Sequence, residues 1–372
     1  MSYERIVIKV GTSTLTGGSN HLDKPRLVDL ARQLSVIAGH GTMVTLVSSG
    51  AVAAGRELLN YPHLSKHIPG KQILASVGQP YLMSIYMDLF KIYNLAAAQI
   101  LLTRNDFIQR KSYLNARNTI EGLLGQHVIP IINENDTVST DEIRVGDNDM
   151  LSAYVSGLIG ADLLVLLTDQ DGLFDMNPEL HAEAKLIDLV DGVEIPSFVW
   201  EAAGGSLTGI GTGGMLTKVR AADVARRMGT PVMIANGTIP DVLLRIAAGE
   251  RFGTVFRATN TVLESRKRYL LTGFRSNEAA IILDSGATQA IKRGKSLLPA
   301  GIIGVQGEFD RGDTVRLVNN DGEEIAVGLV NYSASEIQKI CGAKASEIET
   351  ILGYTYADEV VHQDNMIKGK TR

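Results

Sequence analysis

Residues 5–10 read RIVIKV, an apolar run that is interrupted by a single lysine. The run does not alternate between apolar and polar residues, which is typical of a strand covered on both faces. Similar runs recur over the first 258 residues, with longer stretches of helical pattern between them. The expected strands are Arg5–Val10, Thr42–Ser48, Leu95–Leu101, Val128–Ile132, Leu163–Thr168 and Pro231–Ala235. The expected helices are Lys24–Ala38, Lys71–Tyr93, Ser112–Gly125, Asp147–Gly160 and Met215–Met228.

This alternation of strands and helices predicts an α/β fold, a mostly parallel sheet sandwiched by helices. In such a sheet, ligands bind beyond the carboxyl ends of the strands. The residues that follow each strand are therefore the first candidates for chemistry.

From about residue 259 the pattern changes to short strands separated by glycine turns. The turn Asn319–Gly322 lies between two apolar runs and is a strong hairpin signal. We expect a first domain over residues 1–258, a linker over 259–275 and a small, mainly β domain over 276–354. Residues 355–372 form a polar tail that we expect to fray.

Composition sets the class of protein. The chain has 372 residues, 45% hydrophobic and 21% charged, which suits a soluble globular protein of two domains. Mean hydropathy is +0.07, no apolar run reaches the roughly 18 residues of a membrane span, and the N-terminus lacks a signal-peptide pattern. The single cysteine, Cys341, excludes an internal disulfide. These features predict a cytoplasmic protein without membrane partners.

Two strands end in small residues that suit an anion. After the first strand come Gly11 and small hydroxyl residues, which leave backbone N–H groups free to approach a phosphate, and Lys9 adds a charge. A lysine inside a buried strand is costly unless it has a partner, which favours a functional role. After the second strand, Ser48–Ala51 enters a helix and suits either a bound carboxylate or a plain serine cap.

The fourth strand runs into a segment dense in amides and carboxylates. Asn133, Glu134, Asn135 and Asp136 follow it, and Gly146–Asp149 opens the next helix. An amino-acid ligand needs an acidic partner for its ammonium and amide donors for its carboxylates, so this composition suits such a ligand. A solvated acidic loop remains the alternative interpretation, and a metal-assisted phosphoryl site is compatible too.

The remaining candidates are Asp169 and Asp171 after the fifth strand, and a glycine loop before a helix. Residues 209–214 formally satisfy G-x-G-x-x-G, but no strong strand precedes them, so they do not predict dinucleotide binding. Gly294-Lys295-Ser296 resembles the end of a Walker A loop, but its first glycine is replaced by Gln289. The glycine loop instead places Lys218 on the first turn of a helix, within reach of a phosphoryl group.

Taken in order, these segments closely resemble the amino acid kinase family, in particular its members that phosphorylate glutamate. The motifs are KVGTS from residue 9, SSGAVAAGR from 48, LNARNT from 114, INENDTV from 132, VGDNDMLSA from 145, LLTDQDGLF from 166 and GTGGMLTK from 211. The domain that follows resembles a PUA domain. The resemblance covers the chain to about Tyr354, and it is the combination of motifs that is specific.

The resemblance implies ATP-dependent phosphorylation of the γ-carboxylate of L-glutamate, giving L-glutamyl 5-phosphate in the first step of proline biosynthesis. Lys9, Asp149 and Lys218 would be catalytic, with Asp149 organising the lysines together with Mg²⁺ that ATP itself carries. Glutamate would be bound by Ser49, Asn133, Asp136 and Asn148. The nucleotide would be bound by Lys9, Gly11, Thr168, Asp169, Gly211, Thr212, Gly213, Gly214, Met215, Leu216, Thr217 and Lys218.

The implied chemistry agrees with the residue types. A glutamate side chain with a pKa near 4.3 is already ionised at pH 7, so no general base is needed. The motifs indeed contain no histidine. Catalysis then consists of positioning and charge neutralisation. The family further implies inhibition by proline, a dimer or tetramer, and handover of the product to glutamate-5-semialdehyde dehydrogenase.

Two alternatives stay open. Another amino acid kinase acting on acetylglutamate, aspartate or UMP would share the sheet and the lysines. A protein that binds RNA through the PUA domain is the alternative from another class. Residues 276–354 hold seven basic and eleven acidic residues, a net charge of −4, and the whole chain has a net charge of −5. Phosphate backbones need a basic surface, so we do not expect an RNA partner.

Overall fold

The structure is a computed structural model, and it describes residues 2–61, 68–138, 148–176, 178, 180–204, 214–259 and 279–368. The chain divides into two compact units, residues 1–108 with 116–261, and residues 109–115 with 262–372. The domain boundaries expected from the sequence stay predictions.

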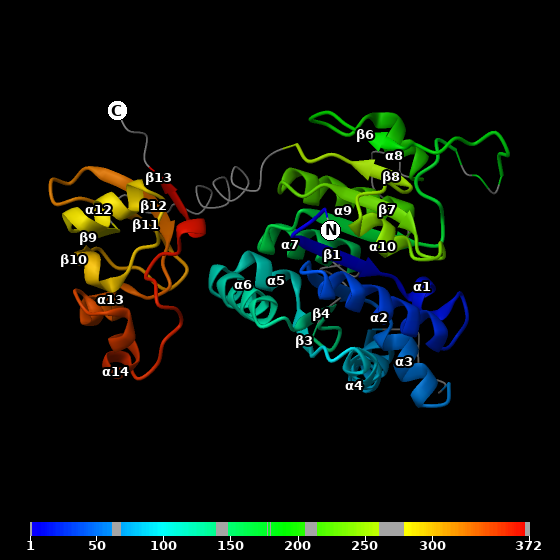
Figure 1. Ribbon diagram of the computed structural model, residues 1–372, viewed down its shortest axis with the longest axis horizontal. Helices are drawn as coiled ribbons and strands as arrows, with labels where there is room; N and C mark the ends of the chain where they lie inside the picture. The colour runs from blue at the N-terminus through cyan, green and yellow to red at the C-terminus, as the bar shows by residue number, and fades with distance from the viewer. Residues whose placement is uncertain are drawn as a thin grey trace. The chain divides into compact units, whose positions relative to one another are not determined.

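The first unit is built on one eight-stranded sheet with the order β3-β4-β2-β1-β5-β7-β8-β6 (Figure 1). Every neighbouring pair is parallel except β7 and β8. The predicted α/β fold with a mostly parallel sheet is confirmed. The strands are β1 Arg5–Val10, β2 Met43–Ser48, β3 Ala97–Leu102, β4 Ile129–Glu134, β5 Leu163–Thr168, β6 Leu189–Val190, β7 Val232–Asn236 and β8 Thr254–Phe256.

Helices cover both faces of this sheet. Ile6, Ile8 and Val10 pack into a core with Leu27 and Leu34 of α2. Successive side chains of a strand point to opposite faces, so Val7 and Lys9 face the other side, where α7 packs on β1 and against α9. The helices that the structure describes before residue 259 are α1 Thr12–Thr16, α2 Lys24–Gly39, α3 Ala51–Leu58, α4 Ile68–Ile92, α5 Arg104–Ile108, α6 Arg110–Gly125, α7 Asn148–Ile159, α8 Ser197–Ala202, α9 Met215–Arg227 and α10 Val242–Ala247.

The end of β4 differs from the sequence prediction. The strand extends to Glu134, so Asn133 and Glu134 lie within it and only Asn135 and Asp136 follow it. The physical reason is pairing with the neighbouring strand, because Leu101 and Leu102 of β3 lie opposite Asn133 and Glu134 in register. The extension turns two polar side chains into buried residues at the carboxyl edge of the sheet.

The second unit has a separate, mostly antiparallel sheet with the order β10-β9-β11-β12-β13. The predicted hairpin is confirmed, since β11 and β12 pair across the turn at Asn319–Gly322, where Gly322 has a φ of 80°. In the described residues from 279 to 368, three α-helices accompany the sheet. The elements are β9 Ala280–Leu283, α12 Ser285–Lys292, β10 Ile302–Gln306, β11 Thr314–Val318, β12 Glu324–Leu329, α13 Ala334–Ile340, α14 Ile348–Leu352 and β13 Met366–Lys368.

The prediction that the polar tail frays is wrong for its described part. Residues 366–368 form β13, which pairs antiparallel with β12. Val361 bridges to Leu297, and both Val360 and Val361 are fully buried in the core of this unit. The described part of the tail is ordered because Val360 and Val361 are buried in this core and residues 366–368 cover an otherwise open edge of β12.

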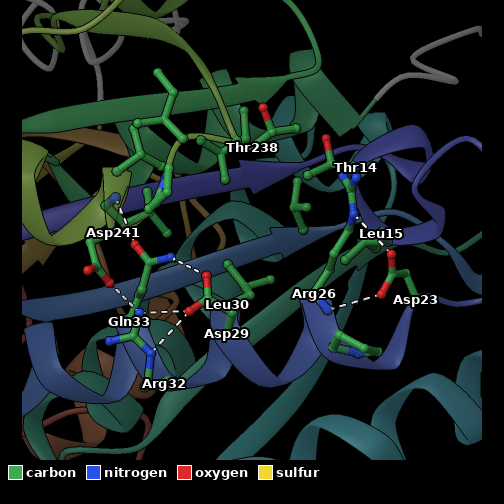
Figure 2. A pocket seen from close by; sticks show the side chains of 18 residues that line it. Thr14, Leu15, Asp23, Arg26, Asp29, Leu30, Arg32, Gln33, Thr238 and Asp241 are labelled. Carbon is green, nitrogen blue, oxygen red and sulfur yellow. Dashed lines mark hydrogen bonds and ion pairs between the residues drawn. The ribbon is translucent and has the colours of Figure 1, made fainter.

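A cavity of about 510 Å³ lies on the α2 face of the first unit (Figure 2). Its apolar floor includes Val10 and Leu167, and its rim carries charged side chains of α2. The arginines are already paired, Arg26 with Asp23 at 3.0 Å and Arg32 with Asp29 at 2.7 Å. Because Val10 and Lys9 face opposite sides of the sheet, this cavity does not contain the predicted lysine site.

Candidate active site

Lys9 forms a buried ion pair at the end of β1. The residue is only 3% exposed, and its Nζ lies 2.5 Å from Oδ1 of Asp149, which is fully buried in the first turn of α7. The register of the sheet places Lys9 opposite Val47 of β2 and Leu166 of β5, in the middle of the sheet. The cost of burying this ammonium is therefore offset by a carboxylate from a distant part of the chain.

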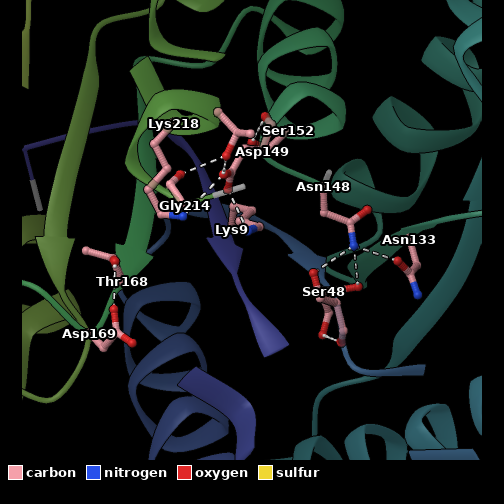
Figure 3. Close-up of polar contacts among 12 residues, drawn as sticks. Lys9, Ser48, Asn133, Asn148, Asp149, Ser152, Thr168, Asp169, Gly214 and Lys218 are labelled. Atoms are coloured by element: carbon pink, nitrogen blue, oxygen red, sulfur yellow. Dashed lines mark hydrogen bonds and ion pairs between the residues drawn. The ribbon is translucent and has the colours of Figure 1, made fainter. Parts of the chain in front are cut away.

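A second lysine reaches the same carboxylate (Figure 3). Nζ of Lys218, on the first turn of α9, lies 3.2 Å from Oδ2 of Asp149. The hydroxyl of Thr217 donates to the same oxygen at 2.9 Å. Gly214 precedes α9 with a φ of 92°, a left-handed conformation that glycine adopts without steric cost.

The pKa of Asp149 lies below its usual value although the group is buried. Burial by itself opposes ionisation, but the charges of Lys9 and Lys218 and the hydrogen bonds from Lys9 and Thr217 outweigh it. An ionised Asp149 between two lysines leaves a net charge of +1 at a point sheltered from water. Such a point suits an anion with several charged oxygens, such as a phosphoryl group.

An amide cluster lies beside this group, toward β4. Nδ2 of Asn148, also in the first turn of α7, donates to Oγ of Ser49 at 2.9 Å and to Oδ1 of Asn133 at 2.8 Å. Ser49 follows β2, and its backbone N–H donates to the carbonyl of Val10 at 3.1 Å. Three of the four predicted glutamate ligands are thereby in contact with one another.

The fourth, Asp136, lies in the turn after β4 and is half-buried. Partial burial and the neighbouring charge of Glu134 raise its pKa to about 6, while Lys71 acts in the opposite direction. Among the described residues, no hydrogen bond or ion pair joins Asp136 to the amide cluster. A carboxyl group whose pKa is raised in this way gains from an added cation, which is the behaviour expected of an ammonium-binding group.

The nucleotide candidates lie mostly on the other side of Lys9. Figure 3 shows Thr168 and Asp169 at the end of β5, across the lysine group from Asn133 and Asn148. The Thr168 hydroxyl donates to Oδ1 of Asp169 at 3.2 Å. Gly11 directly precedes α1, Gly214 directly precedes α9, and residues 215–218 form the start of α9. Gly211, Thr212 and Gly213 lie outside the described residues, as do Gly146 and Asp147.

Two glutamines that the sequence did not indicate extend the amide cluster. Oε1 of Gln79, on α4, accepts from Nδ2 of Asn133 at 2.8 Å. Nε2 of Gln79 donates to Oε1 of Gln99, on β3, at 3.1 Å. Gln79 is 8% exposed, and a polar residue on the buried side of a helix is the only signal that could have found it.

No cluster of three or more histidine, cysteine, aspartate or glutamate side chains that could hold a metal occurs among the described residues. None of the helices in the described part of the chain is long and apolar enough to cross a membrane.

The fold and the site together define a class of small-molecule phosphotransferase. Residues 4–236 match the amino acid kinase family, and residues 279–352 match the PUA domain. The chain belongs to the amino acid kinase family.

Relatives of nearly the same length carry a more specific name. The chain is 49% identical to a protein of Deinococcus radiodurans named glutamate 5-kinase, with 98% of this chain and 99% of that protein aligned. It is 50% identical to the glutamate 5-kinase of Shewanella oneidensis, with 99% and 98% aligned, and 51% identical to that of Herpetosiphon aurantiacus, with 98% of each aligned.

Proposed function

We propose that this chain is a glutamate 5-kinase, which transfers the γ-phosphoryl group of ATP to the γ-carboxylate of L-glutamate. The product is L-glutamyl 5-phosphate, the first intermediate of proline biosynthesis. The single observation that carries the proposal is the buried Lys9–Asp149–Lys218 group, which lies between an amide cluster and the Thr168–Asp169 pair. Relatives at about half identity, aligned over nearly their whole length, support the choice of substrate.

The reaction needs no general base at this site. The acceptor carboxylate is ionised at neutral pH, and its attack on the γ-phosphorus joins two anions, which is the barrier that the enzyme must lower. Lys9 and Lys218 lower this barrier by neutralising the γ-phosphoryl oxygens. Asp149 keeps the two ammonium groups at fixed positions, so that little reorganisation is needed when the phosphoryl group moves.

Specificity for the two substrates is divided between the two sides of this group. Ser49, Asn133, Asp136 and Asn148 bind glutamate, with Asp136 facing its ammonium. Gly11, Thr168, Asp169 and the loop 211–218 bind the nucleotide. In-line transfer follows from this division, because the acceptor and the ATP approach the lysines from opposite sides.

In this proposal Mg²⁺ binds to the enzyme as a complex with ATP. Both oxygens of Asp149 face lysines, so this carboxylate suits the ordering of cations and not direct metal ligation. When bound, Mg²⁺ neutralises phosphate charge and orients the β- and γ-phosphoryl oxygens.

A hydroxamate assay tests the proposal directly. Hydroxylamine traps an acyl phosphate, so glutamate, ATP and Mg²⁺ should give a hydroxamate that is absent when any one of them is left out. The control panel replaces glutamate with N-acetylglutamate or aspartate, and follows ADP release with UMP. Faster turnover of any of these would identify another kinase of the same family.

We propose in addition that proline inhibits the enzyme by competing at or beside the glutamate site. The enzyme works in the cytoplasm as a dimer or tetramer and passes its unstable product to glutamate-5-semialdehyde dehydrogenase. The acidic character of residues 276–354 supports a role of the second domain in regulation or assembly, without an RNA partner. Salt-dependent RNA binding at micromolar protein would contradict this assignment.

A further inference from the structure

Four side-chain amides form one continuous hydrogen-bonded row across the first unit. Starting at the edge of the sheet, the row contains Gln99, Gln79, Asn133 and Asn148. Its members come from β3, α4, β4 and α7, and the three hydrogen bonds measure 3.1, 2.8 and 2.8 Å. We call these four residues the amide row. It ends at Ser49, whose Oγ accepts from Asn148 at 2.9 Å.

The hydrogen bonds of the amide row all run in one direction. Each amide donates through its nitrogen to the oxygen of the next residue toward Gln99. The direction is set at Asn133, because the backbone N–H of Glu134 donates to Oδ1 of Asn133 at 2.9 Å. Only an oxygen can accept that bond, so the orientation of the Asn133 amide is determined independently of its side-chain neighbours. Asn148 must then present its NH₂ group to Asn133.

This direction determines the role of the Ser49 hydroxyl. An amide NH₂ has two hydrogens, and the two shortest bonds of Asn148 use them on Asn133 and Ser49. Since Oγ of Ser49 accepts from Asn148, its own proton points elsewhere. No acceptor for that proton is found in the part of the chain that the structure describes. The Ser49 hydroxyl is therefore a donor, ready for a carboxylate oxygen.

Gln79, on α4, is the member of the row that joins the two strands β3 and β4. It is 8% exposed, so loss of its oxygen would leave Nδ2 of Asn133 buried without an acceptor. Its helix is held firmly next to this point. A Cβ added at Gly78 would lie 1.8 Å from the carbonyl oxygen of Ala51, so α3 and α4 touch backbone to backbone one residue before Gln79. The position of Gln79 relative to Ser49 is thus fixed by α3.

We propose that Gln79 is a positioning residue that acts through Asn133 and Asn148 to make Ser49 a donor toward a substrate carboxylate. The inference rests on the proposed function and deepens it, because it assigns glutamate affinity to a residue that contacts the proposed glutamate ligand Asn133. Gln79 touches neither the lysines nor the nucleotide candidates, so its removal should affect the acceptor acid alone.

The test compares Gln79→Leu with Gln79→Glu in the full chain. Leucine removes the acceptor, whereas glutamate keeps an oxygen for Asn133, loses the N–H toward Gln99 and replaces the neutral amide by a carboxyl group. Gln79→Leu should raise the glutamate KM about tenfold, with kcat and the ATP KM within about twofold of the parent. Gln79→Glu should restore the glutamate KM to within about threefold. Gln126→Leu, which changes an exposed glutamine outside the row, is the matched control.

Two outcomes would overturn the inference. One is an unchanged glutamate KM in Gln79→Leu. The other is a parallel loss of kcat, ATP affinity and Tm that Gln79→Glu does not restore, since that pattern indicates a merely structural role. The parent chain is assayed first on the full acid panel, and KM is then followed for the acid that it phosphorylates best. Failure of the proposed function is thereby visible in the parent, and failure of the positioning role is visible only in the variants.

Discussion

The two halves of the candidate active site differ in chemistry, one being charged and the other neutral. The lysine group around Asp149 uses full charges, fixed in a buried place. The neighbouring half, toward β4, uses neutral amides and one hydroxyl whose hydrogen bonds have a defined direction. Charge stabilises a phosphoryl group whose charge shifts during the reaction, whereas directed donors select a ligand by its shape. The comparison predicts that substitutions on the two sides change different kinetic constants.

The largest effect is expected at Lys218. In Lys218→Ala the kcat should fall by about 10²–10³-fold, because the missing charge matters most while the phosphoryl group moves. The glutamate KM should change much less. Steady-state kinetics with both substrates measures the split, with Lys91→Ala on the exposed end of α4 as a control. Normal turnover in Lys218→Ala would remove this lysine from the catalytic group.

The next effect concerns Asp149. In Asp149→Asn the two lysines lose their common carboxylate, which should lower both turnover and the free energy of unfolding, the latter by about 3 kcal/mol. The lowered pKa of Asp149 determines how its contribution to stability changes with pH. The native carboxylate contributes stability above the unfolded pKa of 3.8, and this contribution is lost as pH falls through the still lower folded value. Urea unfolding of both proteins at pH 7 measures the difference, and equal stabilities would contradict the role of the ion pairs.

A smaller and more selective effect is expected on the amide side. Asp136→Ala should raise the glutamate KM by about tenfold to a hundredfold, because the substrate ammonium loses a partly buried counter-charge. ATP binding should remain largely intact. Isothermal titration with a non-hydrolysable ATP analogue checks the second half of the prediction. A selective defect in ATP binding would show that Asp136 serves the nucleotide and not glutamate.

The smallest effect is a pH dependence of the parent enzyme. Since the pKa of Asp136 is raised to about 6, chiefly by burial, the group is protonated below that pH and cannot pair with an ammonium. The glutamate KM should therefore rise by up to about tenfold for each pH unit below 6 and level off above about 7. In Asp136→Asn the same measurement should give a flat profile between pH 5 and 7, and a profile unchanged from that of the parent would assign the titration to another group.

The strands and helices that frame the site could be predicted from the sequence. β1 and β5 have the predicted bounds, β2 differs by one residue at its start, and β3 and β7 differ by one or two residues at each end. The agreement is close because a strand covered on both faces needs an unbroken apolar run. The expectation that Lys9 must have a partner also came from local information. An ammonium inside an apolar strand is too costly to stand alone.

Contacts between distant elements could not be predicted in this way. The sequence did not indicate that Asn133 lies inside β4, that Gln79 and Gln99 continue the row from Asn148, or that residues 366–368 complete a sheet. It also gave no reason to expect a raised pKa at Asp136, since that shift depends on burial and on Glu134.

The sequence by itself thus determined the class of fold, the elements that carry the candidate residues, and the need for a counter-charge at Lys9. The family resemblance implied that Asp149 organises Lys9 and Lys218, but only the tertiary structure gave the two ion pairs themselves and decided that the amides point in one direction. The physical reason is that apolar periodicity is a local property of the chain. Strand order, register and helix packing bring residues together from far apart, and they alone determine which polar atoms meet.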